Sequence, residues 1–88
     1  MKVIYSKLAI KDARKIKDGK TQQQIKEVIS LLKKTDSVKD ISSIVKMSGH
    51  KTAYRMRIGG YRLGFYLKNN TIELARFVKR NDIYKLFP

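Results

Sequence analysis

The spacing of apolar residues in the first part of the chain predicts one strand followed by two helices. Residues 1–5 form a short apolar run that is typical of a strand, and apolar residues then recur every three or four positions over 8–16 and again over 21–34. Gly19 and Lys20 interrupt this spacing between the two predicted helices. Thr21 and Gln24 have the spacing of a capping box at the start of the second one. We therefore expect a helical hairpin.

In the second half of the chain apolar residues recur at every second position, which predicts an antiparallel meander. Alternating apolar and polar residues indicate strands over 53–58 and 61–68, and a third strand is expected over 71–79. Gly59-Gly60 and Asn69-Asn70 separate these segments and are typical two-residue turns. One side of the first two strands is apolar and forms the predicted sheet core: Tyr54, Met56, Ile58, Leu63, Phe65 and Leu67.

The remaining segments complete a single α+β domain over residues 1–88. Residues 35–40 form a polar connection, and 41–47 is compatible with either a short strand or an irregular segment. Asn81 is placed to cap a short C-terminal helix. The expected order is an N-terminal strand, a helical hairpin packed on one face of the sheet, an antiparallel β-meander and the short terminal helix. On the last strand the pattern assigns no face to Arg76.

The charge of the chain narrows the range of functions. A total of 21 Lys and Arg side chains oppose 7 Asp and Glu, which gives a net charge of +14, and five of the six arginines lie in residues 46–88. Such a domain attracts polyanions or an acidic protein. Because the chain has no Cys and a single His, we expect no disulfide and no typical metal site. The lack of a long apolar segment predicts a cytoplasmic protein without a membrane span or secretory signal.

The polar side of the meander carries the candidate chemistry. Arg55 and Arg57 on one strand and Arg62 on the next point away from the predicted core, and the tight turn between the strands brings them together. Three guanidinium groups repel one another unless an anion lies among them, and Gly64 beside them leaves room for such a ligand. The alternative interpretation is a solvated face of a basic protein.

Two residues near the C-terminus extend this set. Arg80 ends the last predicted strand, and Tyr84 follows it by about one helical turn. A tyrosine at such a position is also typical of a packing residue. His50 lies in a turn, where we expect an exposed loop residue rather than a catalyst.

Two motifs of the chain resemble the RelE/ParE toxin superfamily of type II toxin–antitoxin modules. Gly49 followed by the run YRMRIGGYR at 54–62 is similar to the superfamily pattern G…YRxRxGxYR, and the run RFVKRNDIY at 76–84 is similar to its closing pattern HRxDIY. The expected order of elements agrees with this resemblance along the whole chain. Lys79 stands where close relatives often have His, so an imidazole acid or base is missing at that position.

The resemblance implies a RelE-like fold and a ribosome-dependent, metal-independent endoribonuclease that cuts messenger RNA in the decoding site without a cofactor. It implies catalytic roles for Arg62, Arg80 and Tyr84. It also implies an acidic antitoxin, the ribosome and messenger RNA as partners. We assign RNA binding to four further basic side chains: Arg55, Arg57, Lys51 and Lys79.

Cleavage of RNA by its own 2′-hydroxyl is chemically consistent with these residues. The reaction needs proton removal from the 2′ oxygen, stabilisation of extra negative charge on the phosphate, and a proton for the departing 5′ oxygen. Arginines can stabilise the charge but are poor bases, so the base is Tyr84, a perturbed neighbour, or a group of the ribosome or RNA. Two alternative functions use the same basic surface: a ParE-like inhibitor of DNA gyrase, and a non-catalytic protein that binds RNA or the ribosome.

Overall fold

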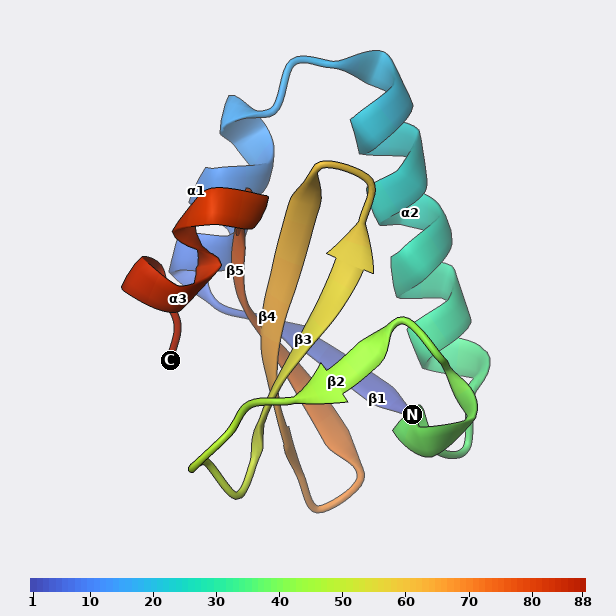
Figure 1. The fold of residues 1–88 in the computed structure, drawn as a ribbon. Coiled ribbons are helices and arrows are strands. Elements are labelled where there is room, and N and C mark those ends of the chain that lie inside the picture. The colour runs from blue at the N-terminus through green and yellow to red at the C-terminus, as the bar shows by residue number, and fades with distance from the viewer.

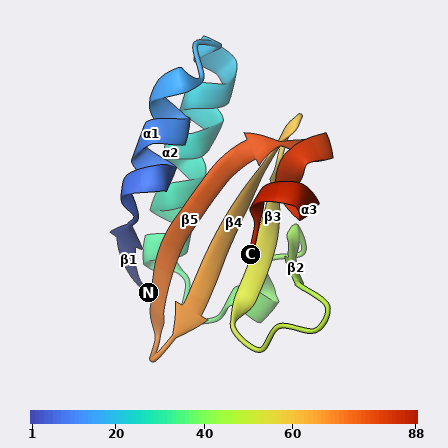
Figure 2. The same ribbon diagram turned by 90° about the vertical axis from the view of Figure 1, so that its left-hand side faces the viewer.

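The computed structural model describes residues 1–88. The chain folds into one sheet with helices on both of its faces (Figures 1 and 2). The elements follow one another in this order: β1 (Lys2–Tyr5), α1 (Lys7–Lys15), α2 (Gly19–Lys34), a 3-10 turn (Val38–Asp40), β2 (Ile44–Lys46), β3 (Ala53–Ile58), β4 (Tyr61–Lys68), β5 (Thr71–Lys79), a second 3-10 turn (Arg80–Asp82) and α3 (Ile83–Leu86). No helix combines the length and the apolar character that crossing a membrane requires.

The sheet has the strand order β1-β5-β4-β3-β2. The strands β2 to β5 are antiparallel neighbours, and β1 joins the edge of the sheet parallel to β5. Figure 2 shows α1 and α2 on one face and α3 on the other. The α+β class and the element order expected from the sequence are therefore confirmed, and the open alternative at 41–47 resolves as the short edge strand β2.

The main core lies between the sheet and the helical hairpin. Four of the six predicted sheet-core residues are buried in it, and Tyr54 and Leu67 are half-buried and pack against it. Tyr54 stacks on Phe65 at a ring-centroid distance of 5.5 Å. The core contains these buried side chains: Ala9, Ile16, Ile25, Leu32, Val38, Met56, Ile58, Leu63, Phe65, Ile72, Leu74 and Phe77.

The start of α2 differs from the prediction. Asp18, and not Thr21, is the N-cap residue, because its carboxylate accepts hydrogen bonds from the amides of Lys20 (3.3 Å) and Thr21 (3.2 Å). The Thr21 hydroxyl donates to the same carboxylate, and this bond, followed by the Thr21 amide bond, lowers the pKa of Asp18. The capping box at Thr21 was wrong because a carboxylate three residues earlier already satisfies the free amides.

A β-bulge explains why the alternation of β5 assigned no face to Arg76. Arg76 pairs with Gly64, whereas Leu74 pairs with Phe65, so Ala75 has no partner opposite it. Even-numbered residues therefore face the helical hairpin before the bulge, and odd-numbered residues face it after the bulge. The core-facing residues are Ile72, Leu74 and Phe77.

An ion pair between the buried Asp12 and the half-buried Arg76 holds β5 to α1 just after this bulge. The Asp12 carboxylate accepts from Nε of Arg76 (2.8 Å), from a terminal nitrogen of Arg76 (3.2 Å) and from the amide of Phe77 (3.1 Å). The hydrogen bond to Asp12 raises the pKa of Arg76 against the opposing effect of burial. Arg76 is therefore a structural residue of the hairpin side of the sheet.

A second, smaller apolar cluster attaches α3 to the opposite face. It consists of Met47, Ala53, Val78, Ile83 and Phe87. The predicted cap at Asn81 was wrong, because Asn81 lies inside the 3-10 turn that precedes α3. That turn begins where the Arg80 amide donates to the carbonyl of Gly60 (3.0 Å). No side chain caps the start of α3.

Candidate functional site

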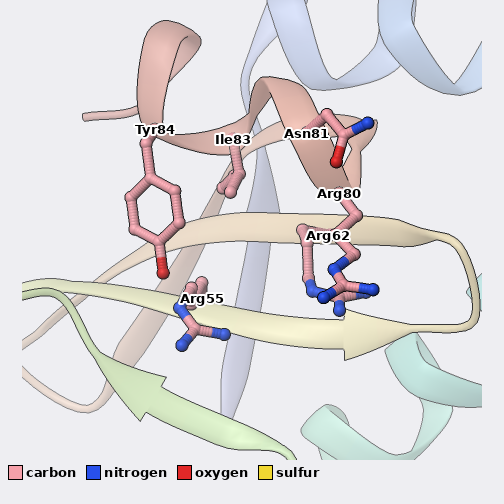
Figure 3. A pocket seen from close by; sticks show the side chains of 6 residues that line it. All are labelled: Arg55, Arg62, Arg80, Asn81, Ile83 and Tyr84. Carbon is pink, nitrogen blue, oxygen red and sulfur yellow. The ribbon is translucent and has the colours of Figure 1, made fainter.

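A basic hollow opens between the sheet and the C-terminal segment (Figure 3). It has a volume of about 460 Å³ and no acidic residue in its lining. Strands β3 and β4, the second 3-10 turn and α3 supply the side chains around it: Arg55, Arg62, Arg80, Asn81, Ile83 and Tyr84. Segments that are far apart in the sequence therefore build one site.

Arg62 is the best-anchored cation of this hollow. One terminal nitrogen of its guanidinium donates to the carbonyls of Gly59 and Tyr61, both at 2.9 Å. Gly59 lies in the β3–β4 turn and Tyr61 is the first residue of β4, so this end of the hairpin fixes the arginine without neutralising it. The other nitrogens remain free to donate to a ligand.

The electrostatics of the hollow are unbalanced. Partial burial, followed by the charges of Arg80, Arg55 and Arg57, lowers the pKa of Arg62, while Tyr84 acts in the opposite direction. Like charges shift a cation in this way when no anion compensates them. A bound anion would therefore relieve repulsion among these arginines and gain several charge-assisted hydrogen bonds.

Tyr84 and Arg55 form one end of the hollow. The guanidinium carbon of Arg55 lies 5.8 Å from the centre of the Tyr84 ring, within the range of a cation–π contact. Tyr84 is 69% exposed. Figure 3 shows its hydroxyl directed towards Arg55, and it shows the guanidinium groups of Arg62 and Arg80 beside each other at the other end.

The structure brings together only part of the predicted set. Arg55, Arg62, Arg80 and Tyr84 line one hollow. Arg57 lines a separate hollow against α2, although it lies close enough to Arg62 to lower the pKa of that residue.

The two predicted RNA-binding lysines lie elsewhere. Lys51 belongs to the loop between β2 and β3, in a hollow that it shares with Lys46 and His50. His50 is exposed in this loop, as predicted. Lys79 is exposed at the end of β5 and lines a groove beside Asp12. These lysines are therefore outside the arginine hollow.

The prediction that Gly64 leaves room for a ligand was wrong. A Cβ atom built on Gly64 would lie 2.6 Å from Cγ of Phe87, because the Phe87 ring covers the glycine. The ring also packs against Tyr66, with centroids 5.1 Å apart. Sequence periodicity placed Gly64 and Tyr66 on the open face correctly, but it did not show that the chain's own C-terminus covers them.

Sequence reasoning missed Asn81 as a lining residue. The signal was its position inside the closing motif, between Arg80 and Asp82, which we interpreted only as a helix cap. Its side-chain amide adds a neutral donor and acceptor to the hollow. No group of three or more His, Asp or Glu side chains comes together in the fold, so the donor set suits an anion rather than a metal ion.

The fold and the hollow define a class of small basic α+β domains in which a sheet presents arginines beside a C-terminal tyrosine. The sequence is 34% identical over 89 residues to Toxin RelE3 of Methanocaldococcus jannaschii, and the alignment covers all of both chains. The chain therefore belongs to the RelE family of toxins, the toxins of type II toxin–antitoxin modules. A comparison with models of protein families finds no match.

Solved structures agree with this assignment. The RelB–RelE antitoxin–toxin complex from Methanococcus jannaschii contains a chain with a TM-score of 0.81 and 29% identity, and the match covers 97% of this chain and 99% of that one. The YoeB dimer from Staphylococcus aureus has a TM-score of 0.71 at 23% identity, covering 90% of this chain and 94% of that one, and so it supports the fold. The RelE-like architecture expected from the sequence motifs is confirmed.

Proposed function

We propose that this toxin cleaves messenger RNA on the ribosome and that the arginine hollow binds the phosphate at the cleaved bond. The observation that carries this proposal is the convergence of three arginines from three segments around a space without any acidic residue. A fold rarely gathers like charges without a ligand of opposite charge, because the repulsion lowers its stability. The phosphodiester is the anion that RNA presents at every nucleotide.

The proposed reaction uses the 2′-hydroxyl of the RNA as the nucleophile. Its oxygen loses a proton and forms a bond to the adjacent phosphorus, while the bond from phosphorus to the 5′ oxygen of the next nucleotide breaks. The departing oxygen gains a proton. The products are a 2′,3′-cyclic phosphate and a free 5′-hydroxyl, so atoms and charge balance without a metal ion or cofactor.

The arginines have separate tasks in this scheme. Arg62 and Arg80 donate to the phosphate oxygens, whose negative charge increases in the transition state. Arg62 suits this task because two backbone carbonyls hold it in place before the substrate arrives. Arg55 binds the backbone at the Tyr84 end. Arg57, Lys51 and Lys79 contact phosphates further along the message or the ribosomal RNA.

Tyr84 is the residue we assign to proton transfer at the 2′ oxygen. It carries the one hydroxyl group among the residues that line the hollow. An arginine has only donors and is a poor base, whereas a hydroxyl oxygen can accept the 2′ proton while it passes its own proton to solvent. Because Tyr84 is 69% exposed, an RNA strand can reach its hydroxyl without displacing protein atoms.

The ribosome supplies the alignment that this open site lacks. Three of the residues that line the hollow, Arg80, Asn81 and Tyr84, are exposed, so the free toxin has little to hold an RNA strand in a reactive geometry. Alignment of reacting groups alone contributes about 7–11 kcal/mol to a reaction barrier. We therefore expect cleavage in the cytoplasm on translating ribosomes and little cleavage of free RNA.

An acidic antitoxin is the partner that we propose for control. Relatives of known structure include RelE in complex with the antitoxin RelB, and YafQ in complex with DinJ. A net charge of +14 favours an acidic segment that covers the sheet and the hairpin. Such a segment would prevent cleavage by covering Arg55 and Arg62 or by displacing α3.

A translating extract tests the proposed function against the two alternatives. Adding the purified toxin is expected to produce truncated messages that end in a 2′,3′-cyclic phosphate. Intact messages together with a loss of DNA supercoiling would contradict the proposal and identify a gyrase inhibitor. Intact messages with blocked translation and normal supercoiling would also contradict it, in favour of a protein that only binds RNA or the ribosome.

A further inference from the structure

The C-terminal helix that carries Tyr84 is attached to the sheet mainly by two buried side chains. Helix α3 contains four residues, and no side chain caps its start. Its buried anchors are Ile83, at 1% exposure, and Phe87, at 3%, whereas Tyr84 itself is exposed. The position of the Tyr84 hydroxyl therefore depends on how these two apolar side chains sit on the sheet.

Phe87 sits in a recess that only a glycine provides. A Cβ atom on Gly64 would lie 2.6 Å from both Cγ and Cδ2 of the Phe87 ring and 3.0 Å from Cδ1. Carbon atoms that are not bonded prefer about 3.5–4.0 Å, so the ring already rests against the backbone of β4. Tyr66 closes one side of the recess, with its ring centroid 5.1 Å from that of Phe87.

This recess lies next to the Tyr84 end of the hollow. Gly64 pairs directly with Arg55 across β3 and β4, and Arg55 is the cation that contacts the Tyr84 ring. The amide of Phe87 donates to the carbonyl of Ile83 at 2.9 Å, which links the anchored ring to the turn that carries Tyr84. Anything that lifts the Phe87 ring from β4 therefore moves Tyr84 relative to Arg55.

We propose that Gly64 and Phe87 are positioning residues for Tyr84. Neither residue lines the arginine hollow, and neither contacts the phosphate in the proposed reaction. The absence of a side chain at position 64 lets the Phe87 ring dock, and the docked ring sets the distance between the Tyr84 hydroxyl and the arginines. The part of this inference that concerns activity rests on the proposed function, whereas the docking of Phe87 does not.

Gly64→Ala is the variant that tests the inference, with Gly19→Ala as its matched control. Gly19 is the first residue of α2, outside the hollow, and a Cβ atom there meets nothing within 4 Å. In single-turnover cleavage on ribosomes, Gly64→Ala is expected to slow the reaction by about 10²-fold at saturating toxin, the scale of a 1 Å misplacement. Its affinity for the ribosome and the rate of Gly19→Ala are expected to match the wild type.

Double variants separate positioning of Tyr84 from a general defect. In a Tyr84→Ala background, Gly64→Ala is expected to cause no further loss, because the residue that it misplaces is already missing. In a Phe87→Ala background the added methyl group meets no ring and is also expected to have no effect. An unchanged rate for Gly64→Ala, or an equal loss with and without Tyr84, would overturn the inference.

Hydrogen exchange tests the docking independently of catalysis. The Phe87 amide is expected to exchange faster in Gly64→Ala than in the wild type, and unchanged exchange would overturn the inference even if the wild-type toxin cleaved no message. A wild type that leaves messages intact would instead refute the proposed function. If Gly64→Ala fails to fold, Phe87→Ala takes its place, since Phe87 belongs to the small cluster and leaves the main core intact.

Discussion

The partly buried pair between Asp12 and Arg76 predicts that removing one partner lowers the stability of the fold more than removing the other. The side chain of Asp12 is 9% exposed and that of Arg76 is 20% exposed. In Arg76→Ala the buried carboxylate keeps only one donor, the Phe77 amide at 3.1 Å. Removing one partner of a fully buried pair typically costs about 3–5 kcal/mol, and the partial exposure of Arg76 places this variant at or below the lower end of that range. In Asp12→Ala, by contrast, Arg76 can turn towards water.

The cost of Asp12→Ala is therefore smaller. Most of the destabilisation in this variant comes from the Phe77 amide, which loses its acceptor. An unsatisfied buried donor costs about 1–3 kcal/mol. The double variant contains the same orphaned amide and no unpaired carboxylate. We expect Arg76→Ala to be the least stable of the three, and we expect adding Asp12→Ala to it to restore part of the lost stability.

Thermal unfolding followed by circular dichroism measures this order. A loss of 1 kcal/mol lowers Tm by about 4–8 °C in a domain of this size, so the difference between the two single variants is well within reach. Arg14→Ala on the same helix is the control, because Arg14 is exposed and forms no ion pair. Additive losses, or a larger loss for Asp12→Ala than for Arg76→Ala, would refute the reasoning.

Three further predictions concern charge. Replacing Arg55 or Arg57 by Ala is expected to flatten the plot of log affinity for RNA against log salt by about one unit each, and an unchanged slope would show that the residue contacts no phosphate. The association rate of toxin and antitoxin, measured by stopped-flow mixing, is expected to fall with rising salt, since charges are screened beyond about 10 Å at 0.1 M, whereas a constant rate would show that apolar docking controls the encounter. Because the pKa of Asp18 is lowered in the folded protein, its stabilising effect is present at neutral pH and disappears as the pH falls below the ordinary value of 3.8. The Tm difference between wild type and Asp18→Ala is therefore expected to shrink in acid, and a difference that stays constant to pH 2 would contradict this.

Local periodicity was sufficient to predict β3 and β4 because both strands are regular and have one buried face. The same reasoning placed Arg55 and Arg62 on the open face, where the structure has them. The same reasoning failed on β5, because the bulge at Ala75 exchanges the two faces of the strand between Leu74 and Phe77. The bulge can be recognised only from the pairing of β5 with β4.

Contacts between distant segments account for what the sequence did not reveal. Asp12 lies on the buried side of α1, which is a signal for a buried polar contact, but its partner Arg76 is 64 positions away. The Phe87 ring on Gly64 is a similar case, because a glycine in a strand is compatible with a ligand or with a side chain of the same protein. The partner of Asp12 and the group that covers Gly64 can therefore be identified only from the folded structure.

The most direct test of the proposed cleavage is a single-turnover measurement on ribosomes with a defined message and saturating toxin. Arg62→Ala is expected to slow cleavage by about 10²-fold or more, the scale of losing one donor to the transition state, and Arg62→Lys is expected to recover only part of the rate because it lacks the planar fork. Arg14→Ala, which removes an arginine outside the hollow, is expected to cleave at the wild-type rate. A rate for Arg62→Ala within twofold of the wild type, at equal folding and ribosome binding, would contradict the assignment of the hollow as the site of RNA cleavage.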